Sequence, residues 1–182
     1  MAQPIVYLPE PLHMDWFSPS PFASLLAQAL NEWCEGDIAM VNAGVLLASL
    51  PKGVVTKGDI HRICPHPINP CKVYLRGSEL KEVILQAETE QMKQLRVRGF
   101  GFRGEVMGQM VYDGVTIEKE TMSDGQEHVR RIFIHHQPID EQKRMRSQQL
   151  ICLRSDTYIL KYIVRKSNIT CPKCCGMCLH GS

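Results

Sequence analysis

The chain has 182 residues, of which 44% are hydrophobic and 22% are charged, and its net charge is +2 at pH 7. This length suits one globular domain with a short appendage. The weak net charge argues against nucleic acid or a membrane as partners, and no stretch reaches the ~18 apolar residues that a membrane helix needs. Residues 1–11 lack the basic and apolar regions of a signal peptide.

Charge and cysteine are distributed unevenly along the chain. Residues 1–140 carry 13 basic and 17 acidic side chains, whereas residues 141–182 carry 8 basic and 2 acidic ones and five of the eight cysteines. We therefore divide the chain into a body, residues 1–143, and a basic, cysteine-rich tail, residues 144–182. The three cysteines of the body favour free thiols in a reducing compartment, so we expect a cytoplasmic protein.

The first third of the chain predicts a strand, a helix and a second strand. Residues 5–8 form the first short strand. Ser20 and Pro21 suit the cap and the first position of a helix. The apolar run Asp37 to Val41 has the length of a strand and ends at a loop, Asn42-Ala43-Gly44. The expected apolar face of the helix, with spacings of three and four, comprises Phe22, Leu25, Leu26, Ala29, Leu30 and Trp33.

The rest of the body mixes helices and strands. Thr56 is expected to cap a short helix that ends near Ile63, a proline-rich loop follows, and residues 71–75 alternate as a strand. A second amphipathic helix begins at Gly77. Asp113-Gly114 predicts a hairpin between residues 110–112 and 115–117, and residues 131–134 form a further strand. Because no regular strand–helix–strand rhythm emerges, the sequence predicts an α+β fold with a mixed sheet.

The body contains none of the common catalytic motifs. The glycines of residues 99–104 have the wrong spacing for a dinucleotide-binding loop. The histidines lack the spacing of a binuclear metal centre, and His135-His136 is a poor metal pair because neighbouring residues on a strand point to opposite faces. We therefore assign no catalytic residue and no metal ligand to the body.

The tail contains the sharpest local pattern in the sequence. Two Cys-x-x-Cys pairs are typical ligands of a tetrahedral zinc ion, although zinc sites usually separate such pairs by a dozen or more residues. A zinc-binding interaction protein is therefore an alternative function, and a structural remnant that binds nothing is another. The zinc ligands would be Cys171, Cys174, Cys175 and Cys178.

Four segments in fixed order carry a family resemblance. They are Ser-Pro-Ser-Pro-Phe-Ala-Ser-Leu-Leu-Ala at 18–27, Gly-Asp-Ile-Ala-Met-Val-Asn-Ala-Gly-Val at 36–45, Val-Thr-Lys-Gly-Asp-Ile at 55–60 and Leu-Arg-Gly-Ser-Glu-Leu-Lys at 75–81. Over residues 5–143 the chain resembles the C-terminal domain of the 5′-nucleotidase and UDP-sugar hydrolase family, which includes 2′,3′-cyclic-nucleotide phosphodiesterases.

The resemblance implies a division of labour. In that family an N-terminal metallophosphoesterase domain holds two divalent metal ions and the catalytic residues, and the C-terminal domain grips the base and sugar. This chain would then be the recognition half of a hydrolase, with no catalytic residue and no cofactor of its own. Its partners would be a nucleotide or related small phosphate ester and a metallophosphoesterase domain. Many family members act outside the cytoplasm, so an extracytoplasmic location is an alternative.

The resemblance also points to substrate-binding residues. The family's strand ending Asn-Gly-Gly-Gly-Ile-Arg falls on residues 42–47, which implies that Asn42 hydrogen-bonds a sugar or base and that Gly44 allows close backbone approach. The family's stacking phenylalanine falls on His66, and its arginine falls on Leu47. We expect Asn42, Gly44 and His66 to line a cleft, with a substrate that differs from the usual nucleotide or is smaller.

The resemblance stops after Lys143. The family has a strand like Thr-Tyr-x-Val-Ala-Thr-x-Asp, where this chain reads Arg-Met-Arg-Ser-Gln-Gln-Leu at 144–150. With a suitable choice of codons, one inserted A after the lysine codon restores Lys-Thr-Tyr-Ala-Val-Ala-Thr-Ala-Asp. We therefore predict a reading-frame shift at this point, in which case the tail was never selected to fold and its cysteine cluster is accidental.

Overall fold

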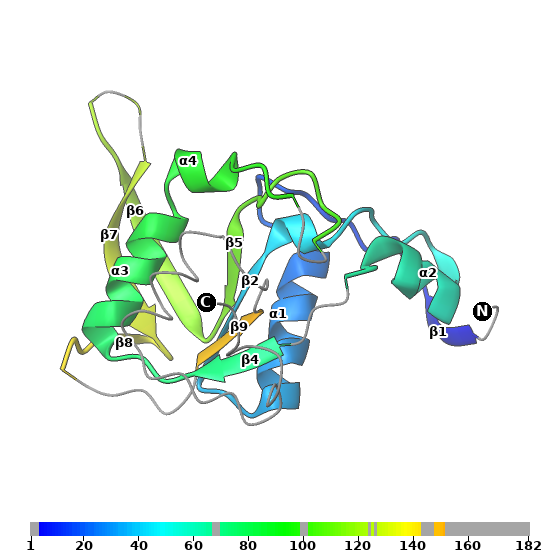
Figure 1. Ribbon diagram of the computed structural model, residues 1–182, viewed down its shortest axis with the longest axis horizontal. Coiled ribbons are helices and arrows are strands. Elements are labelled where there is room, and N and C mark those ends of the chain that lie inside the picture. The colour runs from blue at the N-terminus through cyan, green and yellow to red at the C-terminus, as the bar shows by residue number, and fades with distance from the viewer. Residues whose placement is uncertain are drawn as a thin grey trace, which may run out of the picture.

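The computed structural model describes residues 4–66, 70–98, 102–123, 125, 127–142 and 148–151. Two long helices, shorter helical segments and three small sheets build the fold (Figure 1), which confirms the expected α+β class. None of the helices within these residues is long and apolar enough to cross a membrane. The elements are β1 Pro4–Leu8, α1 Pro21–Cys34, β2 Ile38–Asn42, η1 Ala43–Val45, β3 Gly53–Thr56, α2 Lys57–Ile63, β4 Pro70–Val73, α3 Gly77–Ala87, α4 Glu90–Lys93, β5 Met110–Asp113, β6 Val115–Thr121, β7 Glu127–Ile134, β8 Gln137–Pro138 and β9 Gln148–Ile151.

Helix α1 begins where the sequence predicts. Pro21 occupies the first turn, and the Ser20 hydroxyl accepts a hydrogen bond from the Ala23 N–H, which satisfies one free donor of the helix end. The helix buries Phe22, Ala23, Ala27 and Leu30. Three residues of the expected apolar face are exposed instead: Leu25 at 50%, Trp33 at 67%, and Ala29. The helix is rotated so that the buried set, rather than those three side chains, faces the sheet.

The central sheet has the strand order β4-β9-β2-β5. Strand β2 runs antiparallel to β5 and parallel to β9, and α1 packs against β2 and β5. All five residues of β2 are buried, so both of its faces lie in the core. A strand buried on both faces reads as a continuous apolar run, which explains why residues 38–41 show no alternation. At ~1.5–3 kcal/mol for each fully buried large apolar side chain, this strand is a major source of stability.

The predicted hairpin at Asp113-Gly114 is wrong. Strand β5 pairs with β2, whereas β6 pairs antiparallel with β7 in a separate sheet of order β6-β7-β8. Gly114 has a φ of 76°, and a Cβ there would lie 2.9 Å from the Asp37 carbonyl oxygen. The glycine therefore lets the chain bend from one sheet into the next, and pairing with the buried strand β2 outweighs the local hairpin preference.

A polar cluster links the two sheets to the end of α3. The Tyr112 hydroxyl donates to Glu88 Oε1 at 2.8 Å, and Lys119 Nζ lies 2.9 Å from Glu88 Oε2. Burial, together with the neighbouring Glu88 carboxylate, raises the pKa of Tyr112 well above its usual range. Burial lowers the pKa of Lys119, but its ion pairs with Glu88 and Glu127 outweigh this and leave that pKa raised.

Strand β1 pairs antiparallel with β3 to form a two-stranded ribbon beside α2, at the far end of the molecule in Figure 1. Helix α2 is capped as predicted by Thr56, whose hydroxyl accepts from the Asp59 N–H, while the Asp59 carboxylate accepts from the Thr56 N–H. This reciprocal arrangement is a capping box. It lowers the pKa of Asp59, mainly through the hydrogen bonds from Thr56.

Strand β9 occupies the place between β4 and β2. It lies within the predicted tail, so the central sheet of this structure includes residues from both sides of the proposed boundary at Lys143. The zinc-ligand candidates Cys171, Cys174, Cys175 and Cys178 lie outside the described residues.

Candidate functional site

His66 lies where three loops meet. Its Nε2 donates to the Val45 carbonyl oxygen at 2.7 Å, and its Nδ1 accepts from the Arg103 N–H at 2.9 Å. Since a backbone N–H must donate and a carbonyl must accept, this pattern fixes the neutral tautomer with the proton on Nε2. The imidazole is thus held in one orientation by the 43–45 turn and by the segment that begins at Phe102.

The His66 ring also stacks on Phe102. The two ring centroids are 5.3 Å apart and the planes differ by 12°. Phe102 is only 5% exposed, so its ring forms a buried backing for the imidazole. Two hydrogen bonds and one stacking contact therefore immobilise His66 before any ligand arrives. Sequence reasoning missed Phe102 and Arg103, because the glycines around them indicate a loop but do not reveal which loop it packs against.

Asn42 and Gly44 hold this loop against the end of β2. Asn42 is 4% exposed, and its Nδ2 donates to the Met107 carbonyl oxygen at 3.1 Å. The Gly44 N–H donates to the same oxygen at 2.8 Å. A Cβ on Gly44 would lie 1.9 Å from the Val106 carbonyl oxygen, so only glycine fits. Both residues support the loop, and their direct contact with a substrate stays a prediction.

The Asn42–Gly44 loop and the loop after α2 lie side by side, as the resemblance implies. The Leu47 N–H donates to the Ile63 carbonyl oxygen at 2.9 Å, next to the contact between His66 and Val45. At these points the loops touch directly rather than bordering an open cleft. Leu47 is half-buried and brings no charge to the place where the family has an arginine.

A fourth segment braces the same region. The Trp16 indole N–H donates to the Leu46 carbonyl oxygen at 2.8 Å, and the Trp16 carbonyl accepts from the Gln109 N–H at 2.7 Å. Nearby, burial raises the pKa of the Cys64 thiol, and a backbone hydrogen bond involving His66 lowers it in part. A raised pKa keeps Cys64 protonated, which makes it a weak nucleophile.

The described part of the chain offers no metal centre. No group of three or more His, Cys, Asp or Glu side chains within it could hold an ion. His135 and His136 form a tight turn between β7 and β8, with φ values of 47° and 67°. One ring nitrogen of His135, Nε2, lies 2.7 Å from the Asp37 carbonyl oxygen. The described residues therefore do not fit the two metal ions of the family's catalytic domain.

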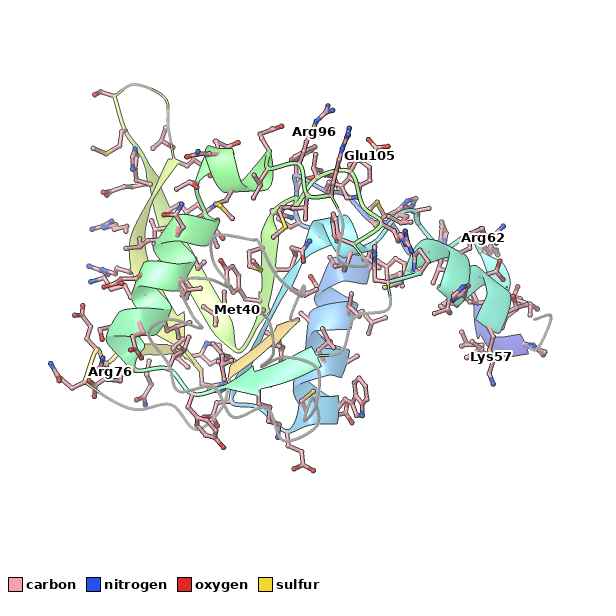
Figure 2. All side chains as sticks on the ribbon, in the orientation of Figure 1. Met40, Lys57, Arg62, Arg76, Arg96 and Glu105 are labelled. Atoms are coloured by element: carbon pink, nitrogen blue, oxygen red, sulfur yellow. The ribbon has the colours of Figure 1, made fainter. Side chains whose placement is uncertain are left out.

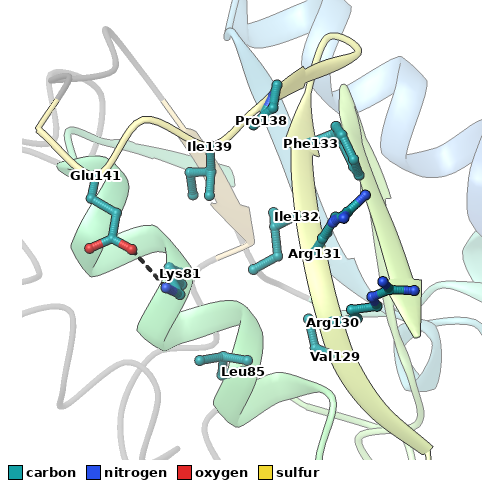
Figure 3. Close-up of a pocket in the computed structure, with 10 residues that line it drawn as sticks. All are labelled: Lys81, Leu85, Val129, Arg130, Arg131, Ile132, Phe133, Pro138, Ile139 and Glu141. Carbon is teal, nitrogen blue, oxygen red and sulfur yellow. Dashed lines mark hydrogen bonds and ion pairs between the residues drawn. The ribbon is translucent and has the colours of Figure 1, made fainter. Parts of the chain in front are cut away.

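Two grooves flank the second sheet. One has a volume of about 380 Å³ between α3 and the β7–β8 strands (Figure 3), and the other, about 540 Å³, lies between the α3–α4 corner and the β6–β7 hairpin. Figure 3 shows Arg130 and Arg131 pointing away from α3, while Leu85 and Ile132 face the space. An ion pair of 2.7 Å between Lys81 and Glu141 closes one side. Neither groove includes a predicted site residue.

This fold and this braced loop cluster define a domain of the nucleotidase type. The sequence matches the 5′-nucleotidase C-terminal domain family over residues 9–146. The chain belongs to that family, as the four segments in order indicated.

Its relatives are longer proteins. The chain is 52% identical over 144 residues to the uncharacterized metallophosphoesterase YunD of Bacillus subtilis, covering 79% of this chain and 31% of YunD. The fold matches a 5′-nucleotidase precursor of Thermus thermophilus with a TM-score of 0.69, 15% identity and coverage of 91% and 32%. It also matches the sulfate thiohydrolase SoxB, from the same genus, with a TM-score of 0.57, 18% identity and coverage of 81% and 27%. The chain thus spans between 27% and 32% of the length of these three proteins.

Proposed function

We propose that this chain is the substrate-recognition domain of a metal-dependent phosphoesterase, and that it binds the nucleoside part of a nucleotide for hydrolysis by a metallophosphoesterase domain. The observation that carries the proposal is the immobilised imidazole of His66. Two hydrogen bonds and the stack on Phe102 fix its plane. A fixed aromatic plane is a suitable platform for a nucleobase, because stacking is worth ~1–3 kcal/mol per base.

The same geometry supports a particular role for each predicted residue. His66 stacks on the base, since both of its ring nitrogens are already hydrogen-bonded to the backbone. Asn42 and Gly44 set the position of the Phe102–Met107 segment, which carries the backing ring. Since Leu47 supplies no charge, the phosphate is left to the catalytic domain. This arrangement fits a nucleoside, or another small planar phosphate ester, better than a ligand gripped by its phosphate.

Calorimetric titration with adenosine, uridine and AMP tests the proposal. We expect binding to the wild-type chain, retention in His66→Phe, and a loss of about fivefold or more in His66→Ala, since one stacking contact is removed. His61→Ala, on the exposed side of α2, is the control. Equal affinities for wild type and His66→Ala would show that His66 is not the platform.

A second variant tests the missing charge. Leu47→Arg restores the residue that the family resemblance implies, so it should raise affinity for AMP but not for adenosine. The same samples should hydrolyse no nucleotide when manganese or cobalt is added. Turnover well above a denatured control would contradict the assignment of this chain to recognition alone.

We infer a cytoplasmic location from the thiols. Cys64 carries a thiol that forms no disulfide within the described residues, and it is half-buried. Thiols persist in reducing compartments, which supports a cytoplasmic location for this protein. Alkylation of intact cells with a thiol-reactive reagent that does not cross membranes should therefore leave Cys64 unmodified.

A further inference from the structure

The β1–β3 ribbon exposes an unusual amount of apolar surface. Ile5 and Tyr7 of β1 are 54% and 62% exposed, Val54 of β3 is 62% exposed, and Ile60 of the adjoining α2 is 40% exposed. We call these four residues the ribbon surface. Figure 1 shows that the ribbon and α2 project from the body of the molecule. Apolar residues gathered this closely on a projecting element indicate a contact surface.

The pairing register explains which side of the ribbon is open. Val55 of β3 is 2% exposed and belongs to the core, and it lies opposite Val6. Tyr7 lies directly opposite Val54, and their side chains point to the other face, since successive residues of a strand alternate. One face of the ribbon is therefore anchored to the body, while the Tyr7–Val54 pair on the other face has no cover in this chain's described part.

The surroundings of the ribbon surface resemble the rim of a protein interface. Lys52, Lys57 and Arg62 are exposed next to it, and Figure 2 shows Lys57 and Arg62 at the same end of the molecule. An apolar centre rich in aromatic and aliphatic side chains, with a charged rim, is the usual composition of such an interface. A two-stranded ribbon is also marginally stable by itself and gains from being covered.

The longer relatives indicate what covers it. The family is by description a C-terminal domain, and the match spans 31% of a metallophosphoesterase. We infer from this description that most of that longer protein lies before the matched region. Strand β1 is the first described element, and a chain that enters this domain from a preceding one therefore reaches the ribbon first. We propose that the ribbon surface is where the preceding metallophosphoesterase domain packs. This inference rests on the proposed function, since it supplies the catalytic partner with a docking place.

A fusion protein tests the inference directly. The N-terminal two thirds of the Bacillus subtilis relative is joined in front of the complete 182-residue chain, and amide hydrogen exchange is compared with that of the chain alone. Peptides covering residues 4–8 and 53–63 should exchange at least about tenfold more slowly in the fusion. Peptides from β6 and β7 serve as the internal reference. Unchanged exchange over the ribbon would overturn the proposal.

Variants separate packing from folding. Tyr7→Lys with Val54→Lys should abolish the added protection in the fusion and leave the thermal midpoint of the chain alone unchanged within about two degrees. Trp33→Lys, at an equally exposed apolar position on α1, should leave the protection intact. Sedimentation of the chain alone tests whether a second copy of the chain covers the ribbon surface instead. A dimer that the Tyr7→Lys change dissociates would show that it does, and would overturn the proposal.

The experiments distinguish failure of the proposed function from failure of the docking proposal. Absence of nucleoside binding at His66 with the ribbon protected in the fusion would refute substrate recognition but not docking. Nucleoside binding with no ribbon protection would refute docking alone.

Discussion

Strands β2 and β9 are parallel neighbours in one sheet, yet their sequences differ in kind. β2 reads Ile-Ala-Met-Val-Asn and is buried along its whole length, whereas β9 reads Gln-Gln-Leu-Ile. The register sets Gln148 and Gln149 opposite Ile38 and Ala39, both of which are fully buried. An interior strand of a covered sheet calls for apolar residues on both faces. Strand β2 has this composition, whereas the first two residues of β9 are glutamines.

The largest effect on stability is expected from replacing the tail that contains β9. We propose that a frame shift follows Lys143, which agrees with a family match that ends at residue 146. A variant that continues from Lys143 as Thr-Tyr-Ala-Val-Ala-Thr-Ala-Asp should be more stable by roughly 3 kcal/mol or more, because the family strand brings the apolar run Tyr-Ala-Val-Ala to an interior place in the sheet. Urea unfolding measures the gain.

The gene sequence is the independent check on that prediction. Codons 143–151 must yield the family strand in the neighbouring frame after a single-base insertion. Codons that yield any other sequence would refute the frame shift. If the chain had the same free energy of unfolding with either tail, β9 would contribute as much stability as the family strand.

Truncating β2 gives the next largest effect. Met40 is 2% exposed and lies opposite Tyr112 on one side and Leu150 on the other, and Figure 2 shows it within the central sheet. Met40→Ala should cost about 2–5 kcal/mol, since it leaves a cavity in the core. Met122→Ala, at 48% exposure, should cost under about 0.5 kcal/mol. Comparable losses at the two positions in urea unfolding would contradict the contrast between a buried strand and the exposed segment after β6.

Local sequence predicted the elements that depend on local chemistry. Ser20, Thr56 and the apolar run before Asn42 determine where α1, α2 and β2 begin or end, because caps and burial act over a few residues. Pairing partners were not predictable in this way. The hairpin at Gly114 was wrong because β5 pairs with β2, which lies about seventy residues earlier.

The same distinction between local sequence and long-range contacts applies to the candidate site. The family pattern points to Asn42, Gly44 and His66, and their contact with a substrate stays a prediction. The backing ring of Phe102 was missed, since its contact with His66 spans a long loop and leaves no periodic signal in the sequence. Recognition of such a contact from sequence would require correlated changes between the two positions.

The turn between β7 and β8 offers a smaller test, at a point where sequence and backbone conflict. Both His135 and His136 have positive φ values, which favour Asn-Gly in a two-residue hairpin turn. His136→Gly should stabilise the chain by about 1 kcal/mol, because left-handed backbone is strained for a residue with a Cβ. His135→Asn should be nearly neutral, since it also loses the contact with the Asp37 carbonyl. Thermal unfolding of both variants measures the difference, and a destabilised His136→Gly would contradict it.

The smallest expected effect concerns α2, where sequence and structure agree completely. Hydrogen bonds from Thr56 lower the pKa of Asp59, so the ionised carboxylate stabilises the folded state. A carboxyl group with a lowered folded-state pKa contributes fully above its unfolded value of about 4, and the contribution disappears as the pH falls through the folded value. The difference in urea midpoint between wild type and Asp59→Asn should therefore shrink between pH 6 and pH 2.5. Thr56→Val removes the main hydrogen-bond donor and should flatten the same difference, whereas a gap independent of pH would mean that Asp59 acts only as a neutral cap.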